Sequence, residues 1–138
     1  MDCEKYFKKI DHILVNGNLA DLEAFIREIE SPIHPTISEH IAHIYAGLVD
    51  YDRNGIFEGP ENRFFDAQKS SYYLALSFEG YKSLCEGGDY DYMSHLAMYY
   101  QQGIATSKNE KMGEYWLDKL YMYKEGMAHK EFLNSRNE

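Results

Sequence analysis

Hydrophobic residues in the N-terminal part of the chain recur with the spacing of two amphipathic helices. Residues three and four apart lie on one face of a helix, so a stripe with this spacing predicts a helix with one buried side. A polar Asn-Gly-Asn break at 16–18 separates the two stripes, and Asn18 with Asp21 has the spacing of a capping box. Residues 1–31 are therefore predicted to form a helical hairpin. The stripes are Tyr6, Phe7, Ile10, Ile13, Leu14 and Val15, followed by Leu19, Leu22, Phe25, Ile26 and Ile29.

The middle of the chain, residues 36–86, carries two further helical stripes on either side of a polar loop. Thr36 is the residue predicted to cap the first of these helices. The second helix is predicted to begin near Glu61 and to bend or stop near Gly80. The apolar positions are Ile37, Ile41, Ile44, Tyr45, Leu48 and Val49 in the first helix, and Phe64, Phe65, Tyr72 and Leu76 in the second.

Glycines divide the last third of the chain into two more predicted helices. The pair at 87–88 is a joint, and a helix is predicted over 89–102, where Gly103 supplies a left-handed stop. The next helix is predicted over 109–123, with Gly126 ending it. No segment shows the sustained period-two alternation that is typical of a strand. The sequence therefore predicts an all-α protein.

Residues 88–126 carry small and aromatic residues in an ordered set. Ala97 and Gly113 let two antiparallel helices approach closely, and Tyr100 and Trp116 fill the space between helix pairs. The whole set is Gly88, Leu96, Ala97, Tyr100, Gly103, Asn109, Gly113, Trp116, Lys119, Leu120 and Gly126. It resembles the tetratricopeptide-like repeat of the Sel-one-like family. The departures from that repeat are Tyr92, Ala97, Asn109, Gly113 and Leu120, which stand where the family has alanine, glycine, aspartate, alanine and alanine.

Residues 37–80 resemble a diverged copy of the same repeat. The resemblance implies a short α-solenoid of antiparallel helix pairs, because one repeat cannot bury its own apolar face and must stack on a neighbour. It also implies a scaffold that binds proteins and carries no chemistry of its own. We therefore expect one helical-repeat domain over 1–138. Its parts are the N-terminal hairpin at 1–31, the diverged repeat with its long loop at 36–86, the clear repeat at 88–126 and a tail at 127–138.

The loop from Asp50 to Glu61 resembles the calcium loop of an EF-hand residue for residue. Such a loop has oxygen ligands at positions one, three, five and twelve, a backbone carbonyl at position seven and a glycine at position six. A residue at position nine can hold a ligating water. The predicted metal ligands are Asp50, Asp52, Asn54, Ile56, Glu58 and Glu61, with Gly55 at the sharp turn. Ca²⁺ is therefore the one cofactor that the sequence suggests.

A plain acidic turn is the alternative interpretation of this loop. Pro60 lies in the exiting turn, and Asn62 follows the loop where an apolar residue is usual. Asparagine and glycine at 54–55 suit an ordinary turn, because both tolerate positive backbone angles. A second metal site, at His40 and His43 on one helix, is less favoured because no HExxH arrangement is present.

Charge and composition narrow the classes of partner. The formal net charge is −9, from 23 acidic and 14 basic residues, which argues against nucleic acid and against an anionic membrane surface. Cys3 and Cys85 do not make a disulfide framework, and no apolar run approaches the length of a membrane span. We therefore expect a cytoplasmic protein. No catalytic signature is present, so we expect no enzyme.

Small, acidic repeat proteins of this kind resemble the immunity proteins and adaptors of bacteria. We therefore expect a non-enzymatic interaction protein that binds and neutralises a basic toxin or effector, since charge complementarity speeds such association. The residues predicted to contact the partner are Asp89, Tyr90, Asp91, Tyr92, Tyr99 and Tyr123. The alternative is a calcium-responsive adaptor or scaffold, in which the loop at 50–61 becomes ordered when it binds the ion.

Overall fold

The computed structural model describes residues 3–29, 31–49 and 59–136 of the 138-residue chain, and side chains as far as Met127. Within these ranges every regular element is an α-helix or a short 3₁₀ helix, and none is a strand. The all-α prediction is therefore confirmed. The chain divides into two compact units, Met1–Ser77 and Phe78–Glu138, and the boundary between them falls inside one helix, α4 (Ala67–Glu86). Each unit has its own hydrophobic core.

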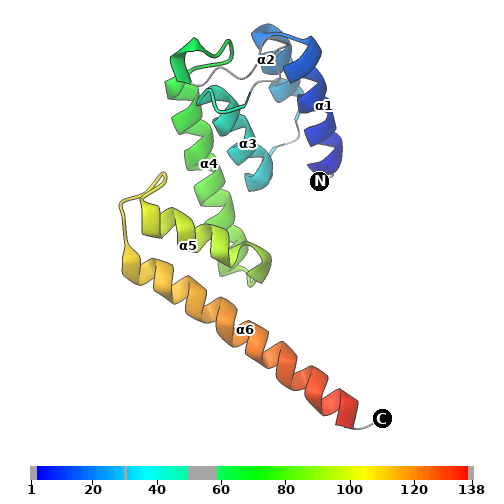
Figure 1. The fold of residues 1–138 in the computed structure, drawn as a ribbon, viewed down its shortest axis with the longest axis vertical. Coiled ribbons are helices and arrows are strands. Elements are labelled where there is room, and N and C mark those ends of the chain that lie inside the picture. Colours follow the sequence, from blue (N-terminus) through cyan, green and yellow to red (C-terminus); the bar gives the residue numbers. More distant parts are fainter. Residues whose placement is uncertain (1–2, 30, 50–58, 137–138) are drawn as a thin grey trace. The chain divides into compact units, whose positions relative to one another are not determined.

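Unit 1 contains α1 (Cys3–Asn16), α2 (Leu19–Glu28), α3 (Pro35–Tyr45), the 3₁₀ helix η1 (Gly59–Glu61) and the first turns of α4 (Figure 1). Helix α1 packs against both α2 and α3. The apolar stripes predicted for these three helices supply most of the core. One further core residue, Phe64, comes from the segment before α4. The buried members of the core are Ile10, Ile13, Leu14, Leu22, Phe25, Ile29, Ile37, Ile41, Ile44, Tyr45 and Phe64.

Local capping rules account for the starts of α2 and α3. The Asp21 backbone N–H donates to Asn18 Oδ1 at 3.0 Å, and the Asn18 N–H donates to Asp21 Oδ2 at 2.9 Å, so the predicted capping box is confirmed. The predicted cap of α3 is wrong. Pro35 is its first residue, and the Thr36 N–H donates to the ring nitrogen Nδ1 of His34 at 3.2 Å. Proline at this position loses no hydrogen bond and has a helical φ, which moves the start one residue toward the N-terminus.

Helix α4 begins at Ala67 instead of near Glu61, and it continues through Gly80 without a break. Asn62 interrupts the predicted start, because its side-chain oxygen accepts a hydrogen bond from the Phe64 N–H at 2.8 Å and forms a local turn. The Phe64 side chain is buried in the core. The Asp66 carboxylate then accepts a hydrogen bond from the Lys69 backbone N–H at 3.1 Å, as the side chain of an N-cap residue does. These tertiary and capping contacts override the helical stripe that the sequence shows.

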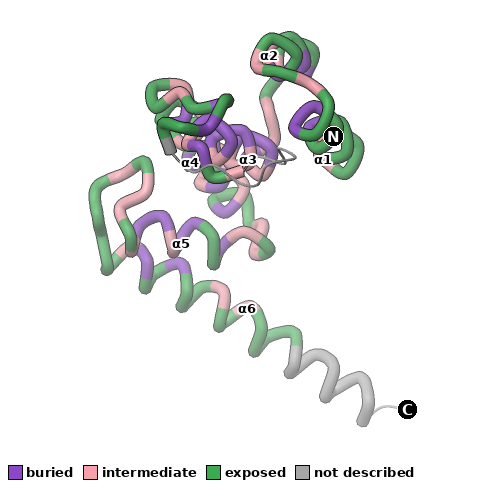
Figure 2. The backbone as a smooth tube through the Cα atoms, turned by 45° about the horizontal axis from the view of Figure 1, so that its top comes forward, coloured by how far each residue is buried: buried purple, intermediate pink, exposed green. Residues whose placement is uncertain are grey.

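Unit 2 contains the last turns of α4, the 3₁₀ helix η2 (Tyr90–Tyr92), α5 (Met93–Gln102) and α6 (Glu110–Arg136). Helices α5 and α6 form the most extensive helix contact in the described chain. Figure 2 shows that α5 is buried over much of its length, whereas α6 changes from buried to exposed along its course. The core of the unit is aromatic. Its buried members are Phe78, Tyr81, Cys85, Met93, Leu96, Ala97, Tyr99, Tyr100 and Trp116.

The sequence predicts the α5–α6 connection well and the end of α6 wrongly. Gly103 is left-handed, with φ 70° and ψ 38°, and the Asn109 side chain accepts from the Met112 N–H at 3.1 Å. Gly113 is buried at the close approach of the two helices, and Trp116 is 3% exposed. Helix α6, however, passes through Gly126 and ends at Arg136. A glycine inside a helix costs only about 1 kcal/mol relative to alanine, which good helix formers on both sides can offset.

Candidate functional site

Three of the residues predicted to contact a partner lie together in a hollow of about 320 Å³ in unit 2. Tyr90 and Asp91 come from η2, and Tyr123 comes from α6. The hollow is completed by Ser94, Leu120, Lys124 and Met127. The predicted set therefore contains a spatial cluster, although its members are up to 33 positions apart in the sequence (123 − 90).

A stacked pair of tyrosines forms the aromatic wall of this hollow. The ring centroids of Tyr90 and Tyr123 are 3.5 Å apart and their planes differ by 18°. A side-chain hydrogen bond to Tyr90 raises the pKa of Tyr123 to about 12, with smaller contributions from burial and from the charge of Asp91. The hydrogen bond therefore ties the Tyr123 hydroxyl to Tyr90, and the two half-buried rings form one platform.

The two aspartates predicted to contact a partner have different surroundings. Asp89 is the N-cap of η2, and its Oδ1 accepts from the Asp91 N–H at 3.1 Å. Asp91 is exposed and lines the hollow, so its carboxylate is available to a partner. Asp89 thus has a structural explanation, whereas Asp91 gives the aromatic platform a negative edge.

The remaining two predicted contact residues belong to the interior of unit 2. Tyr99 is 1% exposed, and its ring is stacked on Phe78 at 6.2 Å and lies edge-on to Tyr81 at 5.7 Å. Tyr99 is therefore packed in the core of unit 2, where its side chain has almost no surface to offer a partner. Tyr92 is half-buried and packs against Tyr81 with the ring centroids 5.5 Å apart. Tyr92 ends η2 and Tyr99 lies on the buried face of α5, and the residue type alone does not distinguish such tyrosines from exposed ones.

Sequence reasoning missed the part of the hollow that α6 contributes beyond Tyr123. Leu120, Tyr123 and Met127 are three and four residues apart, which is the spacing of one helix face. This spacing is visible in the sequence, but the predicted helix ends near Gly126, so the prediction does not place Met127 on the same helix face. Lys124 also lines the hollow and adds a positive charge opposite in sign to Asp91.

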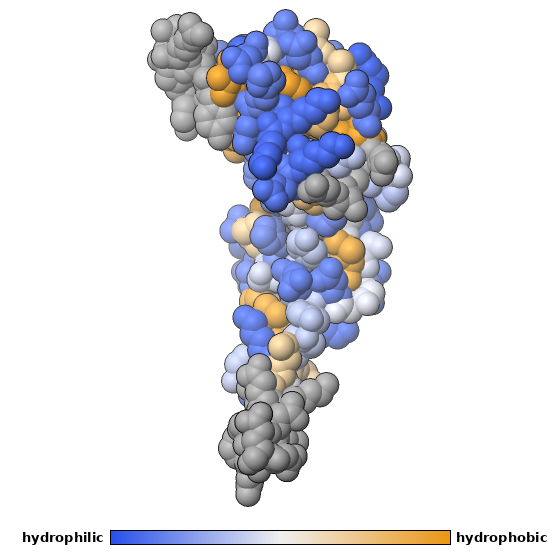
Figure 3. Space-filling model, turned by 90° about the vertical axis from the view of Figure 1, so that its right-hand side faces the viewer, coloured by the Kyte–Doolittle hydropathy of each residue, from blue (hydrophilic) through white to orange (hydrophobic). Residues whose placement is uncertain are grey.

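The exposed side of α6 combines acidic and apolar side chains. Five residues on this side are exposed and have the spacing of one helix face, and Tyr121 is 64% exposed. They are Glu114, Leu117, Asp118, Tyr121 and Glu125. Elsewhere, on the face drawn in Figure 3, hydrophobic residues reach the surface in separate small patches within a mostly hydrophilic surface. Scattered apolar residues are ordinary on a protein surface. This side of α6 therefore presents three carboxylates beside an exposed tyrosine and an exposed leucine.

The predicted calcium loop lies almost wholly outside the described residues. Asp50, Asp52, Asn54, Ile56 and Glu58 fall there, and only Glu61 is described, as an exposed residue at the end of η1. An EF-hand has helices directly before and after its loop. Here α3 ends at Tyr45 and α4 begins at Ala67, so the flanking helices are farther from the loop than the motif requires. The calcium site stays a prediction.

The histidine pair on α3 does not form a metal centre with its described neighbours. Over the part of the chain that the structure describes, no group of three or more histidine, cysteine, aspartate or glutamate side chains is arranged to hold a metal ion. His40 lies edge-on to Phe7, with the ring centroids 5.1 Å apart, and its buried Nε2 has no hydrogen-bond partner in the described ranges of the chain. Burial is the main cause that lowers the pKa of His40. This residue is therefore a neutral, packed histidine.

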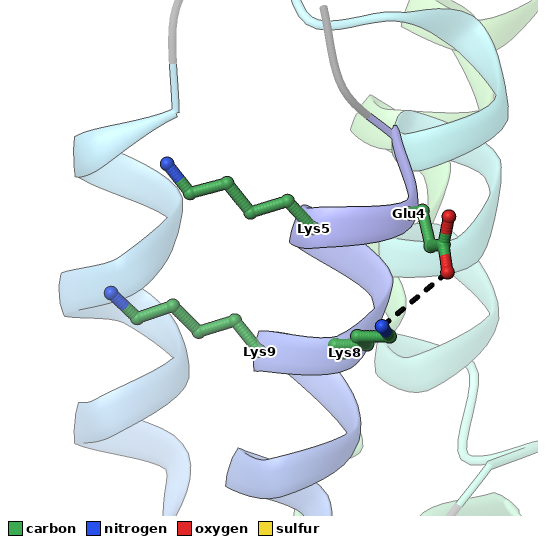
Figure 4. A pocket seen from close by; sticks show the side chains of 4 residues that line it. All are labelled: Glu4, Lys5, Lys8 and Lys9. Atoms are coloured by element: carbon green, nitrogen blue, oxygen red, sulfur yellow. Dashed lines mark ion pairs between the residues drawn. The ribbon is translucent and has the colours of Figure 1, made fainter.

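A basic patch on α1 contrasts with the acidity of the whole chain. Lys5, Lys8 and Lys9 line a second hollow together with Glu4. In Figure 4, Lys5 and Lys9 extend toward α2, while Glu4 and Lys8 lie on the other side of α1. Lys8 pairs with Glu4 at 3.4 Å, and Lys9 pairs with Glu28 at 3.7 Å. These carboxylates offset part of the patch's positive charge.

The described helices include none that is both long and apolar enough to cross a membrane. Comparison of the chain with protein-family models, with curated proteins and with solved structures finds no match. The resemblance to the Sel-one-like repeat therefore depends on the residues of 88–126 and 37–80 alone, and it stays a prediction.

Proposed function

We propose that this chain is a non-enzymatic binding module for a basic protein, and that the hollow of Tyr90, Asp91 and Tyr123 is its contact point. The observation that carries this proposal is the convergence of a stacked tyrosine pair and an exposed carboxylate in one hollow of unit 2. An aromatic ring face and a carboxylate are the two groups that recognise arginine and lysine side chains.

The charge of the chain supports a basic partner over an acidic one. A net charge of −9 steers a positively charged protein toward this surface and repels an anionic one. The acidic stripe of α6, with Glu114, Asp118 and Glu125, extends that field along the same unit. We therefore propose that electrostatic attraction sets the rate of association, while Tyr90 and Tyr123 supply the local contact.

The finer proposal concerns what binding achieves. The resemblance to bacterial immunity proteins leads us to propose that the partner is a toxin or effector, and that the chain neutralises it by covering its basic active surface. Binding without turnover fits a sequence that has no catalytic signature. Stoichiometric inhibition of the partner's activity is the property that separates an inhibitor from a simple adaptor.

The test begins with the immobilised chain and a lysate of the native host. We expect the retained protein to have a high isoelectric point and to bind more slowly as sodium chloride rises from 50 to 300 mM, because salt screens steering charges. Asp91→Asn should weaken binding about fivefold and Tyr123→Ala about tenfold, as for contacts near the centre of an interface. Glu79→Gln, on an exposed position of α4, is the matched control for lost charge.

Three outcomes contradict the proposal. These are an acidic retained protein, a binding rate that does not change with salt, and equal binding by Asp91→Asn and the unchanged chain. The inhibitor function fails separately if a stoichiometric amount of the chain leaves the activity of the bound partner unchanged.

A further inference from the structure

Unit 1 contains a hollow of about 410 Å³ between α2 and α4 that the proposed function does not use. Its sides are formed by three tyrosines and one arginine. These are Tyr45 at the end of α3, Tyr72 and Tyr73 of α4, and Arg27 of α2. Helix α2 and the first turns of α4 both belong to unit 1, and the hollow lies between their side chains. Its volume is in the range of small-molecule sites, which are typically aromatic with a few polar groups.

The aromatic side of this hollow has the geometry of a corner. Tyr45 and Tyr73 are stacked, with ring centroids 5.8 Å apart and planes 17° apart. Tyr72 stands nearly perpendicular to Tyr73, at 5.1 Å and 86°, and it is 60% exposed. A flat ring entering the hollow can therefore lie against the face of Tyr72 while its edge meets Tyr73, and both arrangements are favourable for aromatic pairs.

Among the charged side chains that line the hollow, Arg27 is the one without an ion-pair partner in the part of the chain that the structure describes. Lys69 Nζ donates to Glu23 Oε1 at 2.6 Å and also lies over the Tyr45 ring at 5.4 Å. Glu23 and Lys69 thus neutralise each other. Arg27 makes no hydrogen bond or ion pair through its guanidinium with any residue in the described part of the chain, and it is exposed at the rim. Glu23 raises the pKa of Lys69, and Asp66 also lies close enough to raise it, although less than Glu23 does. Arg27 is therefore the positive group beside the aromatic corner that no carboxylate pairs with in the described part of the chain.

We propose that this hollow binds a small carboxylate that carries a flat aromatic ring, with the ring in the corner of Tyr72 and Tyr73 and the carboxylate on Arg27. A guanidinium holds a carboxylate through two parallel N–H···O bonds, which fixes both the charge and the plane of the ligand. A cationic ligand is disfavoured because Arg27 and Lys69 repel it and Glu23 is already paired. The net negative charge of the chain does not prevent binding, because at physiological salt distant carboxylates are screened beyond about 8 Å.

The experiment titrates the full chain with phenylacetate and follows tyrosine ring and backbone chemical shifts by NMR. For a ligand of this size we expect a Kd on the order of 1 mM. The largest shifts should occur at Tyr72 and Tyr73. Arg27→Gln should weaken binding about tenfold or more, because the carboxylate loses its partner. Lys111→Gln removes the same charge from an exposed position of α6 and should leave the Kd unchanged.

Three further titrations test the chemical class of the ligand. Phenylacetamide, which has the same ring and no charge, should bind at least tenfold more weakly than phenylacetate, and cyclohexylacetate should also bind more weakly because it cannot stack. Equal affinity for the amide, or undiminished binding by Arg27→Gln, would overturn the site. Tighter binding of phenyl phosphate than of phenylacetate would overturn its assignment to a carboxylate. Circular dichroism of Arg27→Gln confirms that any loss of binding occurs in a folded chain.

Discussion

The guanidinium of Arg63 donates to the backbone carbonyl oxygen of Gly17 at 3.0 Å, across 46 positions of sequence. The same side chain donates to the carbonyl of Leu14. Helix α1 ends at Asn16, and the last carbonyls of a helix have no partner within it. Arg63 therefore caps the C-terminus of α1 and fastens the segment that follows the predicted calcium loop to the first helix.

Removal of this cap should destabilise unit 1. Arg63→Ala loses two charge-assisted hydrogen bonds at a partly exposed site, so we expect a loss of about 1–2 kcal/mol in the free energy of unfolding. Arg63→Lys should recover part of this, because one ammonium group cannot reproduce the fork of the guanidinium. Urea denaturation measures both, with Lys111→Ala on α6 as the control. A loss below about 0.3 kcal/mol for Arg63→Ala would show that water replaces the guanidinium at no cost.

Two glycines of α6 provide a matched pair for testing the close approach of α5 and α6. A Cβ at Gly113 would lie 2.5 Å from Gln101 Cγ and 3.2 Å from the Ala97 carbonyl oxygen, whereas one at Gly126 would meet nothing within 4 Å. Gly126→Ala should therefore stabilise the chain by about 0.5–1 kcal/mol through helix propensity alone. In Gly113→Ala the clash offsets this gain, and we expect a stability at least about 1 kcal/mol below that of Gly126→Ala. Equal thermal stabilities would contradict the packing of α5 against α6.

The aromatic core of unit 2 should be sensitive to its one tryptophan. Trp116 is 3% exposed, and its indole Nε1 has no hydrogen-bond partner among the residues that the structure describes. Trp116→Ala should lower the free energy of unfolding by about 3–5 kcal/mol, because it leaves a cavity. Trp116→Phe should cost clearly less, since it keeps most of the ring and removes an unsatisfied N–H. Denaturation followed by circular dichroism tests this order, which the reverse ranking would refute.

The helix caps show where local sequence rules succeed. Asn18, Gly103 and Asn109 act on backbone groups within four residues of themselves, so their roles as caps follow from the sequence alone. The predicted start of α4 failed because Asn62 and Asp66 form competing local contacts, and Asp66 is also held by Tyr45, whose carbonyl accepts its N–H at 2.7 Å. Apolar periodicity cannot reveal a bond between residues 45 and 66.

The candidate site could be predicted only in part for a similar reason. Composition and repeat resemblance pointed to the tyrosines and aspartates near residue 90, and Tyr90, Asp91 and Tyr123 do meet in one hollow. Tyrosine, however, serves equally well in a core and at a surface, so Tyr99 could not be separated from Tyr123 by type. The corner of Tyr72 and Tyr73 requires the three-dimensional placement of α2 and α4, which the sequence does not supply.

The buried histidine of unit 1 gives a prediction for pH dependence. Burial lowers the pKa of His40 below 6.5 in the folded chain, so the unfolded chain binds the proton first as the pH falls. Folding stability contributed by neutral His40 is therefore full above pH 6.5 and is lost as the pH falls below that value. His40→Gln should lose less stability between pH 7 and pH 5 than the unchanged chain. His12→Gln, at an exposed position, is the control, and parallel losses in all three proteins would contradict the assignment.

The calcium prediction can be tested through the one predicted ligand that the structure describes. Glu61 is exposed at the end of η1, and Arg63, two positions later, is fastened to α1. If Asp50, Asp52, Asn54 and Glu61 coordinate one ion, calcium should raise the melting temperature and a chelator should lower it. An ion at a hundred times its Kd adds about 2.7 kcal/mol to stability. A lone loop whose helices begin at a distance suggests weak binding, with a Kd on the order of 10⁻⁴ M.

The variant Glu61→Gln separates a coordinated ion from general screening of acidic charge. Glu61 would give two oxygens to calcium, so its amide should abolish the thermal shift. Because its side chain is exposed and makes no hydrogen bond or ion pair with another described residue, the melting temperature without calcium should stay the same. Asp118→Asn removes one carboxylate from the exposed face of α6 and should keep the full shift. Magnesium should act less than calcium, because it requires a tighter octahedral shell. If several millimolar calcium leaves the melting temperature unchanged, or if magnesium acts equally, the loop at 50–61 is an acidic turn.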